Sequence, residues 1–142
     1  MSYEPITVTE SVSLDRDIHA GTTVVVDAAA GLTLTLPAAE GLGDEYDIFL
    51  LTSVTSNAVV IAVADATDVM AGQAILGQDS ADTAVLFETA ATSDTITLNG
   101  STKGGLKGCR VRLKDVAPNT WATEVIGAAT GTEESPFSAD VS

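Results

Sequence analysis

The chain has 142 residues, and its 20 acidic and 6 basic side chains leave a formal net charge of −14 at pH 7. This length suits a single domain with one core, which buries about 68% of the surface that the unfolded chain exposes. Because phosphate binding requires Lys and Arg clustered over a broad face, we expect no nucleic-acid partner. The sequence shows neither a secretory signal nor a run of about 18 apolar residues, which predicts a soluble protein with no membrane partner.

The side chains available for a core are mostly small. Apolar residues make up 45% of the chain and aromatic residues only 4%. The core is therefore expected to consist mainly of Val, Ile, Leu and Ala. The single cysteine, Cys109, excludes an internal disulfide framework and a thiolate metal cage, and it leaves the redox compartment open.

Strand patterns dominate the chain from one end to the other. In chain order, the expected strands cover residues 6–13, 22–27, 32–36, 46–52, 58–64, 74–77, 84–88, 95–98, 110–114 and 121–127. Polar and apolar residues alternate most clearly at 32–36, 95–98 and 110–114, which is typical of half-buried strands. The other runs are β-branched or continuously apolar, which is typical of strands covered on both faces.

Turn signals separate these runs at intervals of about ten residues, a spacing found in sandwiches and barrels. Asn99-Gly100 is the strongest local hairpin signal, because both residues tolerate positive φ. It predicts that residues 95–98 pair with the strand at 110–114, through a connection that Gly104 and Gly105 lengthen. We therefore predict an all-β fold, a single-domain antiparallel sandwich or barrel.

The two ends of the chain differ from the middle in composition. Residues 1–20 are polar and alternating, and residues 128–142 contain Gly, Thr, Ser and Pro with one large apolar residue, Phe137. Neither end has enough apolar content for a core of its own. We predict an N-terminal arm at 1–20, a β domain at 21–127 and an extended C-terminal tail at 128–142. The arms are either disordered or ordered on another surface.

Few residues are candidates for chemistry. His19 lacks the separated acid and nucleophile that a catalytic triad requires, so we expect an exposed loop histidine. Asp44, Glu45 and Asp47 carry oxygen ligands suited to Ca²⁺, but their spacing differs from an EF-hand loop, and a solvated turn is expected. The stretch GSTKGG at 100–105 lacks the order and the following helix of a phosphate-binding loop. The sequence thus predicts no enzyme activity, no cofactor and no metal.

Five of the six basic residues fall in one stretch, KGGLKGCRVRLK at 103–114. In a strand, Arg110, Arg112 and Lys114 project from one face, and Cys109 lies on the opposite face, where we expect it to pack in the core. The three cations fit a solvated face or an edge guarded against aggregation. They also fit an interaction strip, where another acidic protein or a second copy docks without net repulsion.

Three segments in the C-terminal third occur in a recognisable combination. They are TSDTITLNGSTKGGLKG at 92–108, LKDVAPNTWATEVIG at 113–127 and ATGTEESPFSADVS at 129–142. An Asp-x-Ile-x-Leu-Asn-Gly-x-x-x-Gly-Gly stretch, a Leu-x-Asp…Trp segment and an Ala-Thr-Gly-Thr…Pro-Phe-Ser ending occur together in small β-rich virion proteins of tailed bacteriophages. The chain resembles these proteins over about residues 20–142.

The resemblance implies a head decoration, or cement, protein. Such a protein binds the outside of the assembled head, on the capsid surface of the virion, and stabilises it without catalysis. The implied partners are the major capsid protein and further copies of the chain, as a homotrimer. Arg110, Arg112 and Lys114 are then the expected interaction residues, and Phe137 is expected to anchor the tail in a pocket on its own trimer or on the shell.

A second function remains open at this point, a head fibre that binds the host surface or a carbohydrate-binding virion module. That function requires exposed aromatic platforms, for which Tyr3, Tyr46 and Trp121 are the candidates. Other virion parts, such as a head-to-tail adaptor or a tail component, also fit the resemblance.

Overall fold

The computed structural model describes residues 4–141 and contains twelve strands in this range. The first six are β1 (Ile6–Val8), β2 (Val12–Ser13), β3 (Thr23–Val26), β4 (Leu32–Thr35), β5 (Glu45–Leu50) and β6 (Val59–Ala62). The last six are β7 (Val69–Gln78), β8 (Ala84–Glu88), β9 (Thr95–Leu98), β10 (Arg110–Ala117), β11 (Thr120–Ala129) and β12 (Phe137–Ser138). Within this range no helix is long and apolar enough to cross a membrane. The prediction of an all-β fold is confirmed.

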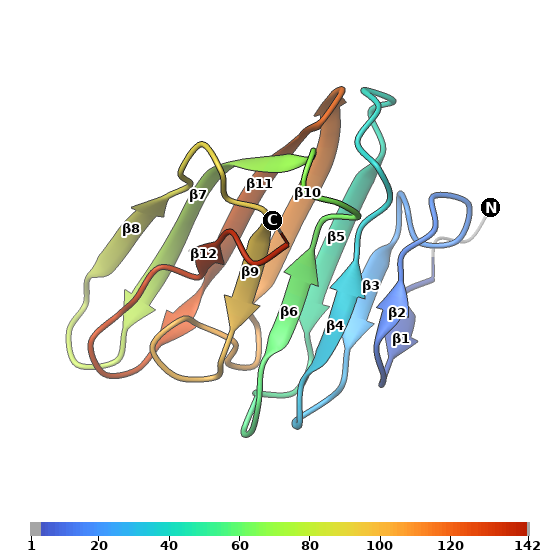
Figure 1. The fold of residues 1–142 in the computed structure, drawn as a ribbon. Coiled ribbons are helices and arrows are strands. Elements are labelled where there is room, and N and C mark those ends of the chain that lie inside the picture. The colour runs from blue at the N-terminus through green and yellow to red at the C-terminus, as the bar shows by residue number, and fades with distance from the viewer. Residues whose placement is uncertain (1–3, 142) are drawn as a thin grey trace.

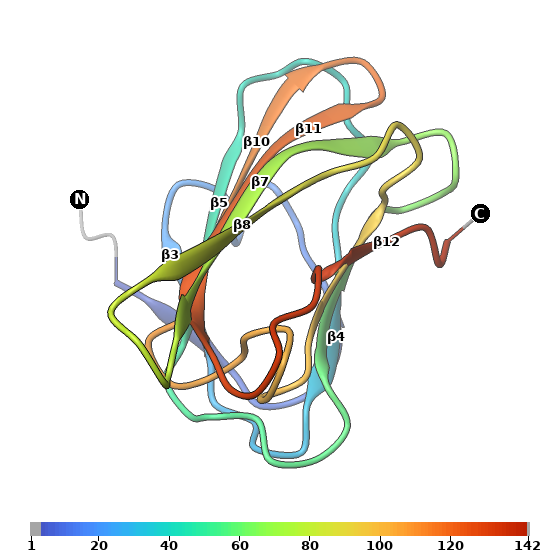
Figure 2. The same cartoon turned by 90° about the vertical axis from the view of Figure 1, so that its left-hand side faces the viewer.

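The strands form two sheets that pack face to face as a sandwich (Figures 1 and 2). One sheet has seven strands in the order β1-β3-β5-β10-β11-β7-β8, and the other has five in the order β12-β9-β6-β4-β2. Both sheets are mixed and so contain parallel as well as antiparallel neighbours. The parallel strands include β1, β3 and β5 in one sheet and β2, β4 and β6 in the other. The prediction of an antiparallel arrangement is therefore wrong.

The parallel pairing follows from the path of the chain between the sheets. From β1 to β6, each strand is followed by one in the opposite sheet, so neighbours within a sheet are two strands apart in sequence. Parallel neighbours need a long crossover connection. In this fold the intervening strand of the facing sheet is that crossover. The expected strand at 6–13 divides for the same reason into β1 and β2, which belong to different sheets.

The core lies between the two sheets and consists mostly of aliphatic side chains, as expected from the composition. The largest buried side chains are Trp121 and Tyr46, whose rings meet edge to face with centroids 5.7 Å apart. Burial alternates along β10 and β11, so each presents one face to the core and one to solvent. The expectation that residues 121–127 form a strand covered on both faces is therefore wrong.

The predicted hairpin at Asn99-Gly100 does not form. Strand β9 pairs with β6 and β12 in the five-stranded sheet, whereas β10 lies in the other sheet. The chain crosses between the sheets after Gly100, whose φ is 76°. The hairpin of this region instead joins β10 to β11 through Pro118 and Asn119, and Asn119 adopts the left-handed conformation with φ 63°.

The terminal segments within the described range are not extended arms, so that expectation is wrong. Strands β1 and β2 extend the parallel side of each sheet, and β12 pairs with β9 at the edge of the five-stranded sheet. Phe137 lies in β12 opposite Ile96 and packs, half-buried, against the core of its own chain. Backbone hydrogen bonds from Asp94 to Ser138 and from Thr97 to Pro136 hold the same segment.

Truncation of Phe137 should release the C-terminal segment. Full burial of a Phe side chain contributes roughly 1.5 to 3 kcal/mol, and Phe137 is half-buried, so Phe137→Ala should cost about 1 kcal/mol. Limited proteolysis with mass spectrometry should show faster cleavage within the segment that follows residue 129. Val116→Ala, at a side chain that is 47% exposed, is the control and should leave the pattern unchanged. Equal cleavage of both variants would contradict the anchoring contact.

Cys109 packs in the core, as predicted, and is 1% exposed. A side chain at Gly127 would come within 2.8 Å of the Cys109 Sγ, so the thiol sits directly against the neighbouring backbone. Burial raises the pKa of Cys109. The packing limits access to the sulfur atom, and the raised pKa disfavours the thiolate form.

We expect Cys109 to be inert in the folded protein. A thiol reagent at pH 8 should label it only as fast as the protein opens, and should label it at once in denaturant. Cys109→Ser should lower the free energy of unfolding by about 1 to 3 kcal/mol, because it buries a hydroxyl in an apolar site. Rapid labelling of native protein would contradict this expectation.

Candidate interaction surface

The outer face of the seven-stranded sheet, which points away from the five-stranded sheet, holds three of the six basic residues of the chain. The basic strip of Arg110, Arg112 and Lys114 projects from β10 onto this face, as the alternation predicts. Strand β10 is the central strand of the sheet. The interpretation of the strip as a guarded edge is therefore wrong, and the cations lie in the middle of a broad surface.

Carboxylates of β5 neutralise two of the three cations. Arg110 Nε lies 3.2 Å from Asp47 Oδ1, without the alignment of a hydrogen bond, and Lys114 Nζ lies 3.4 Å from Glu45 Oε1. The Arg110 guanidinium also lies over the Phe49 ring, 5.6 Å from its centroid. These side chains are partly exposed, so each ion pair is worth at most about 1 kcal/mol.

Arg112 is the member of the strip that has a different environment. It is exposed, and its register partners are Asp47 on β5 and Glu124 on β11. Across residues 4–141, the three ion pairs involve Arg16, Arg110 and Lys114, and none involves Arg112. Its guanidinium donors are thus available to a carboxylate of another molecule.

Strand register arranges the outer face in rows that cross the sheet. A charged row contains Thr23, Asp47, Arg112, Glu124, Gln73 and Glu88. Beside it an apolar row contains Thr7, Val25, Phe49, Arg110, Ile126, Ile75 and Leu86. The rows expose large apolar side chains and charges side by side, which is the composition of an interaction surface.

The outer face is hollowed over its central strands. A shallow depression of about 740 Å³ spans β5, β10, β11 and β7, and a second of about 310 Å³ lies beside it. Ala71 and Ala122 line the larger depression together with Glu45, Lys114 and Glu124. Small side chains between long charged ones therefore create the hollow.

The outer face is close to neutral, unlike the rest of the molecule. It carries the three cations of the strip and four acids, Glu45, Asp47, Glu88 and Glu124, for a formal charge of −1. Subtracting this from the total of −14 leaves −13 for the remainder of the chain. Repulsion between this chain and another acidic protein is therefore weakest at the outer face.

Aromatic rings do not form an exposed platform in the part of the chain that the structure describes. Trp121 and Tyr46 are each 1% exposed, and burial raises the pKa of Tyr46 to about 12. Phe49 is half-buried beneath Arg110. The remaining candidate, Tyr3, lies outside the described residues.

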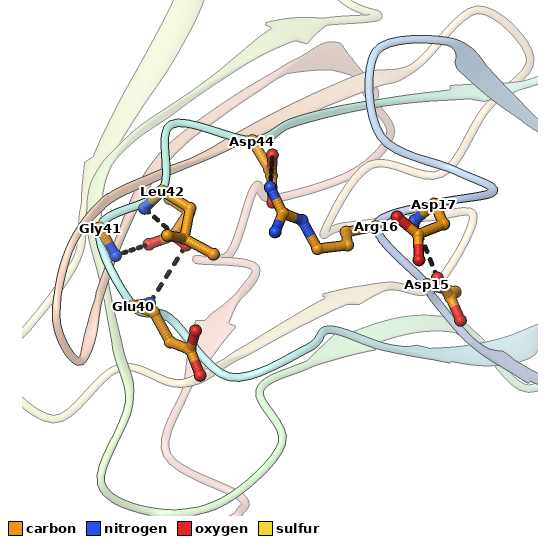
Figure 3. Close-up of polar contacts among 8 residues, drawn as sticks. Asp15, Arg16, Asp17, Glu40, Gly41, Leu42 and Asp44 are labelled. Atoms are coloured by element: carbon orange, nitrogen blue, oxygen red, sulfur yellow. Dashed lines mark hydrogen bonds and ion pairs between the residues drawn. The ribbon is translucent and has the colours of Figure 1, made fainter.

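The other sequence candidates are structural. His19 is 6% exposed, and its Nδ1 accepts a hydrogen bond from the Asp15 backbone N–H at 2.9 Å, so the expectation of an exposed histidine is wrong. Asp44, Glu45 and Asp47 contact different cations, with Asp44 2.8 Å from Arg16 (Figure 3). Among residues 4–141, no group of three or more His, Cys, Asp or Glu side chains is arranged to hold a metal.

A buried carboxylate holds the loop that precedes β5. Asp115, 2% exposed, accepts backbone hydrogen bonds from Gly41 at 2.7 Å, Glu40 at 3.1 Å and Leu42 at 3.2 Å. Figure 3 shows these three backbone nitrogens converging on one carboxylate. Sequence reasoning missed Asp115, because its hydrogen-bond partners at residues 40–42 are far away in sequence and no local pattern points to them.

Sequence reasoning also missed Glu124 and Ile126, which face outward on β11. Their alternation with buried Thr123 and Val125 was the available signal.

The fold and this surface define an all-β protein of two mixed sheets with a mixed-charge sheet face. No protein-family model, curated protein or solved structure matches the chain.

Proposed function

We propose that this protein is a bacteriophage head decoration protein, which binds the outside of the assembled capsid and stabilises it without catalysis. The observation that carries the proposal is the basic strip at the centre of a nearly neutral face in a chain of charge −14. Such a face is where an acidic or mixed-charge partner docks with least repulsion. The resemblance over residues 20–142 supplies the partner, the major capsid protein, and the location, the capsid surface of the virion.

Decoration of this kind stabilises a shell by mass action. A protein that binds the assembled lattice but not its free subunits shifts the equilibrium toward assembly. Individual surface ion pairs contribute little, but identical contacts repeated over many copies add. Arg112 is the central contact in this proposal, and Phe137 enters it as the anchor of the C-terminal segment on the protein's own core.

The alternative of a host-surface or carbohydrate-binding virion module has less support. It requires exposed aromatic rings, and the rings of Trp121 and Tyr46 are buried. Measuring the copy number of the protein per particle, relative to the major capsid protein, separates the two functions. Hundreds of copies fit decoration, and a few copies fit a fibre.

Reversal of the charge at Arg112 should weaken binding to heads. Arg112→Glu leaves the core face of β10 unchanged, so the fold should persist. In cosedimentation with undecorated heads, we expect affinity to fall about three- to tenfold at low salt and less at high salt, because salt screens exposed pairs. Lys107→Glu makes the same charge change at an exposed position before β10 and is the matched control.

Two results would count against this proposal. Wild-type protein that does not sediment with heads at any salt concentration excludes decoration. If wild-type protein binds and Arg112→Glu binds equally well throughout the salt series, the strip is a solvated surface and the docking face lies elsewhere.

A further inference from the structure

Strand β8 leaves one edge of the seven-stranded sheet open. Backbone bonds from Gln78 to Thr83 and from Thr89 to Gly72 flank the β7–β8 pair. Hydrogen-bonded and non-hydrogen-bonded pairs alternate in an antiparallel ladder. Residues 83, 85, 87 and 89 therefore face β7, and residues 84, 86 and 88 direct their N–H and C=O groups to the open edge. In Figure 2 no other segment of residues 4–141 crosses in front of β8.

This edge lacks the usual protection against pairing. Natural edge strands are kept short or carry Lys, Arg, Pro or a bulge. The other described edge strands, β1, β2 and β12, have three, two and two residues. Strand β8 has five, with the sequence AVLFE, and contains no cation and no proline. Its one charge is Glu88, at its end.

The apolar row of the outer face runs to this open edge. Ile126 is 48% exposed, Ile75 is 44% exposed and Leu86, on β8 itself, is 56% exposed. The three side chains are register partners on β11, β7 and β8. A strand added beside β8 would cover Leu86 and extend the row.

We infer that a second copy of this chain pairs with β8, antiparallel and with Leu86 on the two-fold axis, to join two seven-stranded sheets into one. This register pairs the whole of β8 with itself. Leu86 faces Leu86, Ala84 faces Glu88 and Val85 faces Phe87 of the other copy. The inference rests on this edge, its apolar row and its charges, and it does not depend on the proposed binding to the capsid. It expects a dimer in solution, in place of the homotrimer that the resemblance implies.

Charge favours this register over one centred on Glu88. Two chains of charge −14 repel each other, and acids placed opposite one another at the contact would add to that repulsion. With Leu86 on the axis, Glu88 faces Ala84 and Asp82 falls opposite Ala90, so no acid in the paired region faces another. A register centred on Glu88 would place two like charges directly opposite, which is destabilising. The pairing is also isologous, so it closes as a dimer rather than as a filament.

The mass of the protein in solution tests the pairing first. Sedimentation equilibrium from micromolar to millimolar concentration should show a rise from 14.4 kDa toward twice that mass. Leu86→Lys, which places two cations on the axis, should remove the rise. Ile126→Lys, at a similarly exposed position of the same row but away from the edge, should retain it. A monomer at every concentration, a trimer, or loss of the dimer in Ile126→Lys alone would overturn the inference.

Two further variants test the geometry directly. Leu86→Pro removes an N–H that points to the open edge, so the protomer should fold while the dimer is lost. In Leu86→Cys, the two Cα atoms of a hydrogen-bonded pair lie about 5.5 Å apart, within disulfide range. Oxidation should therefore cross-link Leu86→Cys but not Ala84→Cys, whose residues lie about 14 Å apart across the axis. Cross-linking of Ala84→Cys alone would overturn the register.

Discussion

Gly72→Ala should be among the most destabilising single substitutions in this protein. A Cβ at residue 72 would lie 1.7 Å from the backbone oxygen of Thr123 on the adjacent strand β11. The obstacle is a backbone carbonyl, so relief requires β7 and β11 to separate along the longest parallel pairing of the sheet. We expect a loss of about 3 kcal/mol or more in the free energy of unfolding. The melting temperature should fall by about 10 °C.

Gly77→Ala provides a matched control in the same strand. A Cβ at residue 77 would lie 3.8 Å from the nearest atom, the Gly127 oxygen, which is an ordinary contact distance. Neither Gly72 nor Gly77 has a positive φ. Because glycine in a strand costs conformational entropy, Gly77→Ala should be neutral or should stabilise by up to about 1 kcal/mol. Urea denaturation of the two variants measures the difference. Equal stabilities of Gly72→Ala and Gly77→Ala would show that the backbone of β11 does not approach Gly72 so closely.

Asp115→Ala should also destabilise strongly, because it leaves three backbone N–H groups of the loop at residues 40–42 without their acceptor. Hydrogen bonds to a charged group are worth about 1.5 to 3 kcal/mol each, and water reaching the loop offsets part of the loss. We expect a cost of about 3 kcal/mol in urea denaturation.

Asp115→Asn tests the cause of that loss. The amide oxygen can take the place of Oδ2 and accept from Glu40 and Leu42, but its NH₂ group then faces the Gly41 N–H, which previously donated to Oδ1. The cost should be intermediate, about 1 to 2 kcal/mol. Asp44→Asn, which affects only the partly exposed pair with Arg16, should change stability little. A loss at Asp44 as large as that at Asp115 would contradict the role of the three bonds.

Local patterns in the sequence determined much of the secondary structure. Alternation identified β4, β9 and β10, and it assigned Cys109 and Arg110 to opposite faces of the strand region that contains β10. A side chain's face depends only on the two-residue period of the strand, so this information is local. The first half of β7, which contains Gly72, and the two-residue β12 escaped detection, because pairing partners rather than composition define them.

Only the tertiary structure decided which strands are neighbours. A turn signal reports that the chain changes direction, but not whether it returns within one sheet or crosses to the facing sheet. Asn99-Gly100 crosses, whereas Pro118-Asn119 returns. Neighbours in turn decided the surroundings of the basic strip: Arg110 and Lys114 meet acids of β5, far away in sequence, while Arg112 does not. The exposed edge at β8 is likewise a property of sheet order. Hydrophobic periodicity specifies which side of a strand is buried, and only long-range backbone pairing specifies what lies beside it.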